Sequence, residues 1–402
     1  SARWNGIDYL YAAGFWIGGT VLGERLVTTG QYAMEFQATD APADTIYATA
    51  QGALHGMRFP WPGADDDGDG LEDEDPLDGI DNDEDGQIDE DFAAISSQHF
   101  QCLMYDNLAR IVEAFPDHTP LNLEAVQHAV QWENDAVDDF VGFDYTITNV
   151  GVIDAEHVYI GFFADCDIGP RGSGDVASDD MAGSWRGMVR ASDGGWVPID
   201  VGYMYDAAEN DRVEGYFGVL FLGHDIDPTG RNAPQQVGLR TFQSFSSNAA
   251  FEQGGDPTND EQAYELLSAL PRDRDANTRP GSQADFRILV SAGPFRRLEP
   301  GRSLGFQVAM VCGSGLGTST GGRGLLAHCA EAWLTWHGIY LDEIPEVSTL
   351  PGRRINPGQR GRETMLCLED FGPDTSDNPF YAFIPDFMDT SCIDPLWAVA
   401  QQ

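Results

Sequence analysis

Between Ala64 and Phe92 the chain carries sixteen Asp and Glu side chains and no Arg or Lys. The pattern D-x-D-x-D-G-x-x-D occurs twice in this stretch, with an offset of 16 residues. When a chain wraps around a centre, alternate Asp residues bring their carboxylates together, and the glycine allows the sharp turn. Oxygen ligands of this kind suit Ca²⁺ better than a transition metal. The repeat therefore predicts two tandem calcium-binding loops over residues 65–91.

Each loop offers four aspartates and one backbone carbonyl, which belongs to the residue after the glycine. An EF-hand loop would place Glu at its twelfth position, where this chain has Pro76 or Phe92, so the loops are not EF-hands. A bidentate ligand must then come from another carboxylate, and Asp78, Glu74 and Glu90 are candidates. The predicted ligands are Asp65, Asp67, Asp69, Leu71, Asp73, Asp78, Asp81, Asp83, Asp85, Gln87 and Asp89.

The two loops resemble the calcium loops of thrombospondin type 3 repeats and related bacterial modules, and the resemblance covers residues 65–91 only. It implies an extracellular setting, where such modules bind Ca²⁺ with Kd of about 10⁻⁴–10⁻³ M. The alternative is a solvated acidic linker, which explains the charge but not the repeated glycine. Without metal, carboxylates within one Debye length of about 8 Å repel each other, and the segment should loosen.

A second group of carboxylates could also bind a cation. Asp165 and Asp167 follow a predicted strand, and Asp175, Asp179 and Asp180 follow in a glycine-rich loop. Strand ends that meet a loop can bring such side chains together, although an ordinary solvated loop explains the same residues. A weaker pattern of the same kind contains Asp206, Glu209 and Asp211. We include Asp165 and Asp167 among the predicted metal ligands.

Enzyme motifs give little support for catalysis. The segment GTSTG places Ser319 in a G-x-S-x-G pattern, but the surrounding glycine-rich stretch is too long for the tight strand–turn–helix of a nucleophile elbow. The eight His residues include no H-E-x-x-H motif. The many carboxylates leave a glycosidase pair neither excluded nor located. We predict that the chain is not an enzyme.

The composition limits the possible partners. The formal net charge is −44 over 402 residues, which disfavours nucleic acid and anionic membranes and attracts cations. No apolar run approaches the length of about eighteen residues that a membrane span needs. The six cysteines form no C-x-x-C pair, and their even number suggests three disulfides, with buried free thiols as the alternative.

Alternating apolar residues predict a mainly β fold with few helices. Strands are expected over 9–38, in DTIYATAQG (44–52), in EGYFGVLFLGH (214–224) and in 285–313, where Pro300 and Gly301 form a turn. Residues 138–169 predict a hairpin of a β-sandwich, and 121–134 fit either a helix or a strand. Helices are expected over 258–270, capped by Thr258 and ending before Pro271, and near 322–341.

The predicted organisation is a β-sandwich-like body with a calcium-loop insert. Residues 1–64 form an N-terminal β segment of the body, 65–91 the tandem loops and 92–342 the rest of the body. Residues 343–402 are rich in Pro and Gly but keep aromatic side chains, so we expect an extended segment that packs on the body or on a neighbouring subunit.

A wider resemblance covers about residues 14–311. The order GFWIGG, DGIDNDEDGQIDEDF, DYTITNVG and GPFRRLEPGRSLGFQVA is similar to a group of uncharacterised secreted or cell-surface bacterial proteins. This resemblance implies an extracellular or cell-surface location, but it suggests no activity for the chain. Two functions stay open: a calcium-stabilised structural protein that assembles with copies of itself into a filament, sheet or matrix, and a calcium-dependent module that binds polysaccharide through exposed Trp side chains.

Overall fold

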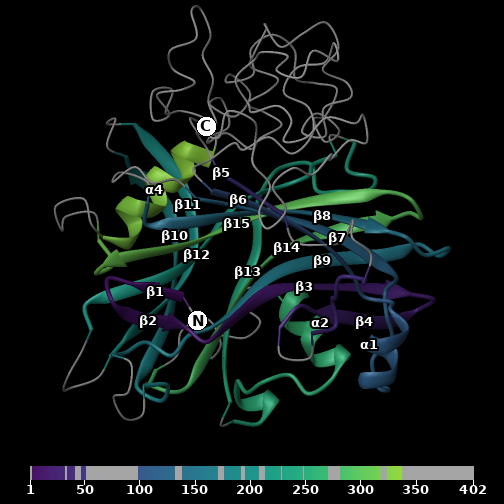
Figure 1. Cartoon of the computed structure of the whole chain (residues 1–402), viewed down its shortest axis with the longest axis horizontal. Coiled ribbons are helices and arrows are strands. Elements are labelled where there is room, and N and C mark those ends of the chain that lie inside the picture. Colours follow the sequence, from purple (N-terminus) through teal and green to yellow (C-terminus); the bar gives the residue numbers. More distant parts are fainter. Residues whose placement is uncertain are drawn as a thin grey trace, which may run out of the picture.

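The described part of the chain is a sandwich of two antiparallel sheets with a helix on each outer face (Figure 1). The computed structural model describes residues 2–31, 34–40, 47–50, 98–131, 138–170, 176–191, 195–207, 213–227, 229–247, 249–269, 281–317 and 324–336. The predicted calcium loops over 65–91, the segment 343–402 and Ser319 lie outside these residues. The prediction of a mainly β fold with few helices is confirmed.

The larger sheet has eight strands and the smaller sheet has five. A separate pair, β1 (Ala2–Trp4) and β2 (Ile7–Leu10), precedes them. In spatial order the larger sheet contains β10 (Asp180–Arg190), β11 (Trp196–Asp206), β12 (Gly215–His224), β15 (Ser303–Ser314), β8 (Phe140–Asn149), β7 (Leu123–Gln131), β6 (Gln98–Tyr105) and β5 (Tyr47–Ala50). The smaller sheet contains β13 (Leu239–Ser246), β14 (Phe286–Leu298), β9 (Ala155–Asp165), β3 (Ala12–Val21) and β4 (Glu24–Thr29).

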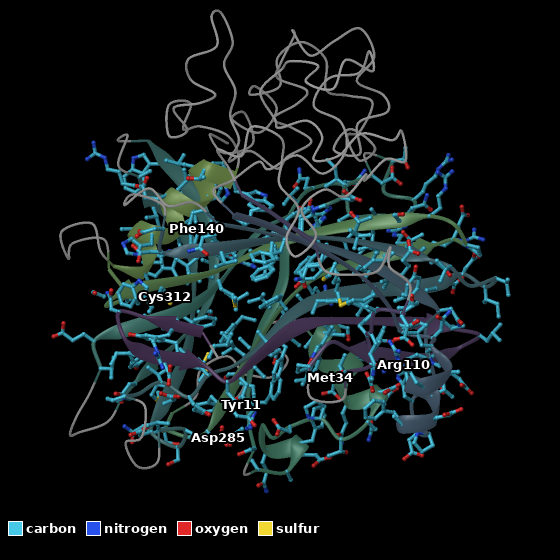
Figure 2. All side chains as sticks on the ribbon, in the orientation of Figure 1. Tyr11, Met34, Arg110, Phe140, Asp285 and Cys312 are labelled. Atoms are coloured by element: carbon cyan, nitrogen blue, oxygen red, sulfur yellow. The ribbon has the colours of Figure 1, made fainter. Side chains whose placement is uncertain are left out.

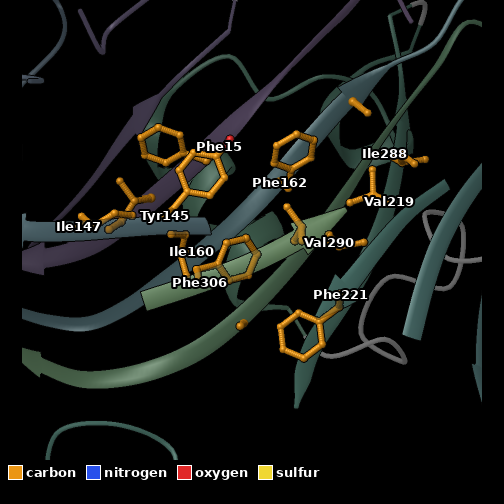
Figure 3. Close-up of a cluster of buried hydrophobic side chains, with 14 of the residues drawn as sticks. Phe15, Tyr145, Ile147, Ile160, Phe162, Val219, Phe221, Ile288, Val290 and Phe306 are labelled. Atoms are coloured by element: carbon orange, nitrogen blue, oxygen red, sulfur yellow. The ribbon is translucent and has the colours of Figure 1, made fainter. Parts of the chain in front are cut away.

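Aromatic and branched side chains fill the space between the two sheets (Figure 3). Phe15 and Phe162 come from the smaller sheet, and Tyr145 and Phe306 come from the larger one. The rings of Phe15 and Tyr145 lie 4.8 Å apart across the interface, a separation at which aromatic pairs attract each other. This layer is the main hydrophobic core, and it holds the strand ends of both sheets in fixed positions.

Several strands are buried on both faces because helices cover the outer sides of the sheets. In β12, Phe217 and Val219 face the main core, whereas Leu220 packs toward α4 (Leu325–Trp336). On the other side, α2 (Asp260–Ser268) buries Leu267 against the smaller sheet. A short helix, α1 (Ala109–Ala114), and a 3₁₀ turn over Phe251–Gln253 complete the described helices. The sequence pattern of these strands is therefore nearly continuous and apolar.

The structure settles or corrects several local predictions. Residues 123–131, which fitted a helix or a strand, form strand β7. The N-cap of α2 is Asn259, whose side chain accepts a hydrogen bond from the Gln262 N–H, so the prediction of Thr258 is wrong by one residue. Either residue type can cap a helix, and only the backbone conformation decides between neighbours. The turn at Pro300 and Gly301 is confirmed, with Gly301 at a φ of 75°.

The predicted hairpin over 138–169 is wrong, although both of its strands exist. Strand β8 pairs with β7 and β15 in the larger sheet, whereas β9 pairs with β3 and β14 in the smaller sheet. The chain therefore crosses from one sheet to the other between Asn149 and Ala155. The alternation of apolar residues indicates a strand but does not identify its partner, because both strands bury both faces.

The prediction of three disulfides is also wrong. The four cysteines among the described residues, Cys102, Cys166, Cys312 and Cys329, are all free. Three pairs from six cysteines would require at least one pair within these four. The alternative of buried thiols fits Cys166 and Cys329, which are fully buried, and burial raises the pKa of both thiols well above the ordinary value.

One buried side chain joins two of the places where the chain crosses between the sheets. The amide Nδ2 of Asn149 donates to the carbonyls of Ile153 and Leu298, each at 2.9 Å. Its Oδ1 accepts from the Gly151 N–H, also at 2.9 Å. The β8–β9 crossing and the β14–β15 crossing are thereby held together by a single amide that is completely buried.

We predict that Asn149→Asp destabilises the fold by about 2–4 kcal/mol, because a carboxylate cannot donate to the two carbonyls and leaves them unsatisfied. Denaturant unfolding followed by Trp fluorescence measures this change. Val152→Ala is the matched control, since Val152 lies in the same crossing and is exposed, and its stability should stay within about 0.5 kcal/mol of the parent. Equal stability of Asn149→Asp and the parent would contradict the role of this amide.

Candidate metal centre

Four strand ends meet at one end of the sandwich and bring acidic side chains together. Asp165 is the last residue of β9, and Asp167 follows it by two residues. Asp285 comes immediately before β14, which pairs with β9 in the register Arg287–Asp165. Figure 2 shows Asp285 and Tyr11 at this end of the molecule, and the Tyr11 N–H donates to the Asp165 carbonyl at 2.9 Å. The pairing of β9 with β14 thus fixes the backbone positions of Asp165 and Asp285 relative to each other.

The carboxylates of Asp165, Asp167 and Asp285 each place an oxygen within 4.8 Å of the other two. Asp165 is 2% exposed, and the other two are partly exposed, so the group opens to solvent on one side. The Ser247 hydroxyl donates to Oδ2 of Asp285 at 2.6 Å and fixes the orientation of that carboxylate. Hard oxygen ligands on rigid strand ends suit Ca²⁺, which takes six to eight oxygens at about 2.3–2.6 Å.

Arg287 supplies a positive charge beside this group. Its Nε lies 3.4 Å from Oδ1 of Asp165, and its Nη1 lies 3.3 Å from Oδ1 of Asp285 and 3.8 Å from Oδ2 of Asp256. One guanidinium therefore faces three carboxylates, and Asp167 adds a fourth negative charge. The arrangement keeps an excess of negative charge that a divalent cation would neutralise. An ion-pair network around Arg287 without metal is the simpler alternative.

Asp180 adds a deeply buried carboxyl next to the group. It begins β10, is fully buried, and its Oδ2 accepts from the Ile168 N–H at 3.3 Å, whereas Oδ1 has no hydrogen-bond partner among the described residues. Burial raises the pKa of Asp180 to about 9, and the negative charges of Asp179, Asp206 and Asp167 act in the same direction. Without a cation, Asp180 is therefore protonated at neutral pH.

The structure brings together some of the carboxylates that the sequence singled out. Asp165 and Asp167 do lie together, and Asp179, Asp180 and Asp206 approach the same end of the sandwich. In the sheet register Asp180 lies opposite Asp206. Asp175, Glu209 and Asp211 lie outside the described residues, as do the ligands predicted over 65–91. Asp285, Asp256 and Arg287 also belong to this group of charges and were not predicted from the sequence. The only available signal was that the segment Asp285–Phe286–Arg287 opens a predicted strand.

Comparison with known proteins identifies no relative: no protein-family model matches the chain, and no curated protein matches its sequence. The secreted bacterial resemblance therefore stays a prediction. Among the described residues, no helix combines the length and apolar character that a membrane crossing requires.

We predict that Asp167→Asn and Asp285→Asn each remove one calcium site of the protein, because each takes away a charged ligand from the group within 4.8 Å. Isothermal titration with Ca²⁺ should show the number of bound ions falling by one. The matched control is Asp154→Asn, since Asp154 lies just before the other end of β9 and forms an exposed ion pair with Arg297. Unchanged stoichiometry in both site variants would show that this group binds no calcium.

The buried carboxyl of Asp180 predicts a specific pH dependence. Its folded-state pKa is raised from 3.8 to about 9, so its protonated form is favoured by folding, and this stabilisation is lost as the pH rises from about 4 through about 9. In excess chelator, the Tm of the parent should fall over this range more steeply than that of Asp180→Asn, a neutral isostere. If the Tm of the parent and that of Asp180→Asn fell equally with rising pH, the raised pKa would not belong to Asp180.

Proposed function

We propose that the chain is a secreted calcium-binding structural protein of the cell exterior, which assembles with copies of itself into a filament, sheet or matrix. The observation that carries the proposal is the convergence of Asp165, Asp167 and Asp285 within 4.8 Å on rigid strand ends. The repeated acidic loops predicted over 65–91 extend the same chemistry. Calcium at millimolar concentration outside cells would fill sites of this kind.

An exposed sheet edge supports the assembly part of the proposal. Strand β10 is eleven residues long and lies at the end of the larger sheet in its described strand order. Trp185 and Met188 on this strand are 40% and 43% exposed. An edge strand offers unpaired backbone groups, and long apolar edges are templates for pairing with another chain. A second copy that adds a strand here would extend the sheet.

The second candidate, polysaccharide binding, is favoured by exposed Trp side chains. Trp196 is 57% exposed and lies on β11, next to the strand that carries Trp185. However, Trp196 pairs with Arg190 and Trp185 pairs with Val201, so the two Trp side chains point to opposite faces of the sheet. They cannot form one flat platform for a sugar chain, and we therefore place assembly first.

We predict that purified protein forms polymers in millimolar Ca²⁺ and that excess EDTA dissolves them, lowers the Tm and opens residues 65–91 to proteases. The reason is that unneutralised carboxylates repel each other once the cation is removed. Negative-stain electron microscopy, thermal unfolding and limited proteolysis measure the three effects. Monomers in both conditions would contradict assembly, and an unchanged Tm would contradict calcium stabilisation.

Variants of the acidic loops separate their contribution from that of the strand-end site. Asp81→Asn and Asp85→Asn should weaken calcium binding, because both residues lie on the alternating pattern of the second loop. Asp66→Asn is the control, since Asp66 lies off this pattern. Equal losses at the three positions, measured by calcium titration, would contradict the register of the loops.

A further inference from the structure

The two ends of the sandwich carry different side chains. Strands β3, β9 and β14 lie side by side, and β9 begins at Ala155 and ends at Asp165, in the candidate metal centre (Figure 1). Ala155 pairs with Leu298, the last residue of β14, and Thr20, near the end of β3, pairs with Glu156. The β8–β9 crossing and the β3–β4 and β14–β15 turns therefore lie together, at the end opposite the metal centre.

Three exposed arginines at this opposite end have no carboxylate partner. Arg231 lies in the connection from β12 to β13, Arg296 lies near the end of β14, and Arg302 lies in the β14–β15 turn. The Arg296 N–H donates to the Asn232 carbonyl at 2.6 Å, which places the first of these connections beside β14. Within the described ranges, none of the three guanidinium groups forms an ion pair or a hydrogen bond.

Unpaired arginines are unexpected in this chain, because 66 acidic residues face only 22 basic ones. Arg297, next to Arg296, pairs with both Asp154 and Glu299. Arginines elsewhere in the described structure also pair with carboxylates, namely Arg3, Arg25, Arg110, Arg186 and Arg287. The three unpaired guanidinium groups thus collect at one end of the molecule.

Several carboxylates at this end are already bonded to other groups. The Asp227 carboxylate accepts from the N–H groups of Arg231 and Asn232, and Oδ2 of Asp225 accepts from the Gly305 N–H. Asp154 and Glu299 belong to Arg297, and the exposed acids that remain are Glu24 and Glu156. This end is therefore close to neutral, whereas the whole chain has a net charge of −44.

Exposed aliphatic side chains lie on the same turns as the arginines. Val152 is 91% exposed in the β8–β9 crossing, and Leu22 is 82% exposed at the β3–β4 turn. The Arg302 carbonyl accepts from the Asn149 N–H, so the arginine-bearing turn adjoins the crossing. A group of exposed apolar residues on adjoining turns marks an interaction surface. We call this surface the arginine end; it comprises Leu22, Val150, Val152, Ile153, Arg231, Arg296 and Arg302.

The metal-centre end offers the complementary chemistry. One guanidinium, that of Arg287, lies among four carboxylates, so a single bound Ca²⁺ would still leave an excess of negative charge. The Tyr11 side chain at this end is 62% exposed, and its ring can contact aliphatic side chains or stack with a guanidinium. We call this surface the acidic end; it comprises Tyr11, Asp165, Asp167, Asp256 and Asp285.

We propose that the arginine end of one copy docks on the acidic end of the next, so that chains join head to tail along their strands. This inference rests on the proposed assembly and names the two surfaces that carry it. Because the surfaces differ, the contact is heterologous, and it gives an open filament unless the rotation between copies closes a ring. Asp285 precedes β14 and Arg296 lies near its end, roughly 30 Å away at the rise of a β-strand, so one copy can hold two neighbours.

An anionic polymer is the other partner that unpaired arginines could bind. It would have to approach a molecule of net charge −44, whose field repels polyanions. Two copies also repel each other, but the head-to-tail orientation brings opposite charges together and is thereby selected over other orientations. Strand β10 lies along the side of the larger sheet, so pairing there would not compete with this contact.

The test uses two variants of the full chain that each block one end. Arg296→Glu/Arg302→Glu reverses the charge of the arginine end, and Tyr11→Arg/Asp167→Arg reverses that of the acidic end. By sedimentation velocity in millimolar Ca²⁺, each variant alone should associate at least tenfold more weakly than the parent. An equimolar mixture should form one-to-one dimers, because each variant supplies the end that the other lacks. Arg296→Lys/Arg302→Lys is the matched control and should assemble like the parent.

The possible failures are distinguishable. Undiminished assembly of both blocked variants, or a mixture that forms no dimers, would overturn head-to-tail docking and leave assembly through another surface such as β10 in place. A parent that stays monomeric would overturn assembly itself. Dextran sulfate that binds the parent but not the arginine-end variant, with no dimers in the mixture, would assign the arginines to a polyanion instead. The Tm of each variant is measured first, and Tyr11→Arg alone replaces the acidic-end variant if Asp167→Arg prevents folding.

Discussion

The packing of two antiparallel sheets through a shared aromatic layer is the constraint on which the rest of the molecule depends. Because Phe15, Tyr145 and Phe162 fill the space between the sheets, the strands cannot slide without opening a cavity in the core. A shift of one residue would also turn every side chain to the opposite face. Strand ends are therefore fixed, and the carboxylates that follow them meet at one place rather than spreading over a loop.

The same constraint explains how so acidic a chain can carry buried charges. Carboxylates at strand ends are held by backbone and side-chain donors, as Ser247 does for Asp285, and by Arg287 at their centre. These donors do not remove the excess of negative charge, since one guanidinium faces three carboxylates. Repulsion between these carboxylates therefore lowers the stability of the folded state. A cation bound from solution would reduce this repulsion.

Much of the fold could be predicted from the sequence, but the partners of its strands could not. The apolar runs of β12 and β15 identify strands, and the spacing of α4 identifies a helix with a buried face. The crossing after Asn149 was predicted as a hairpin. Alternating apolar residues show which side chains of a strand are buried, but they do not show which strand pairs with it. The predicted N-cap of α2 lies one residue from the observed one, because Thr258 and Asn259 both belong to the residue types that cap helices.

The candidate site was predictable only where its residues are neighbours in sequence. Asp165 and Asp167 follow one strand and could be identified together. Asp285 lies 120 residues later and reaches them only through the pairing of β9 with β14, which no local pattern reveals.

The free cysteines have a consequence for how the described sandwich is stabilised. No covalent cross-link joins Cys102, Cys166, Cys312 or Cys329, so the described sandwich depends on no oxidant for its shape. Burial keeps the thiols protonated, and the thiolate is the form that reacts. The stability of the described sandwich therefore does not depend on a disulfide among these four cysteines, and a reductant should leave its architecture unchanged.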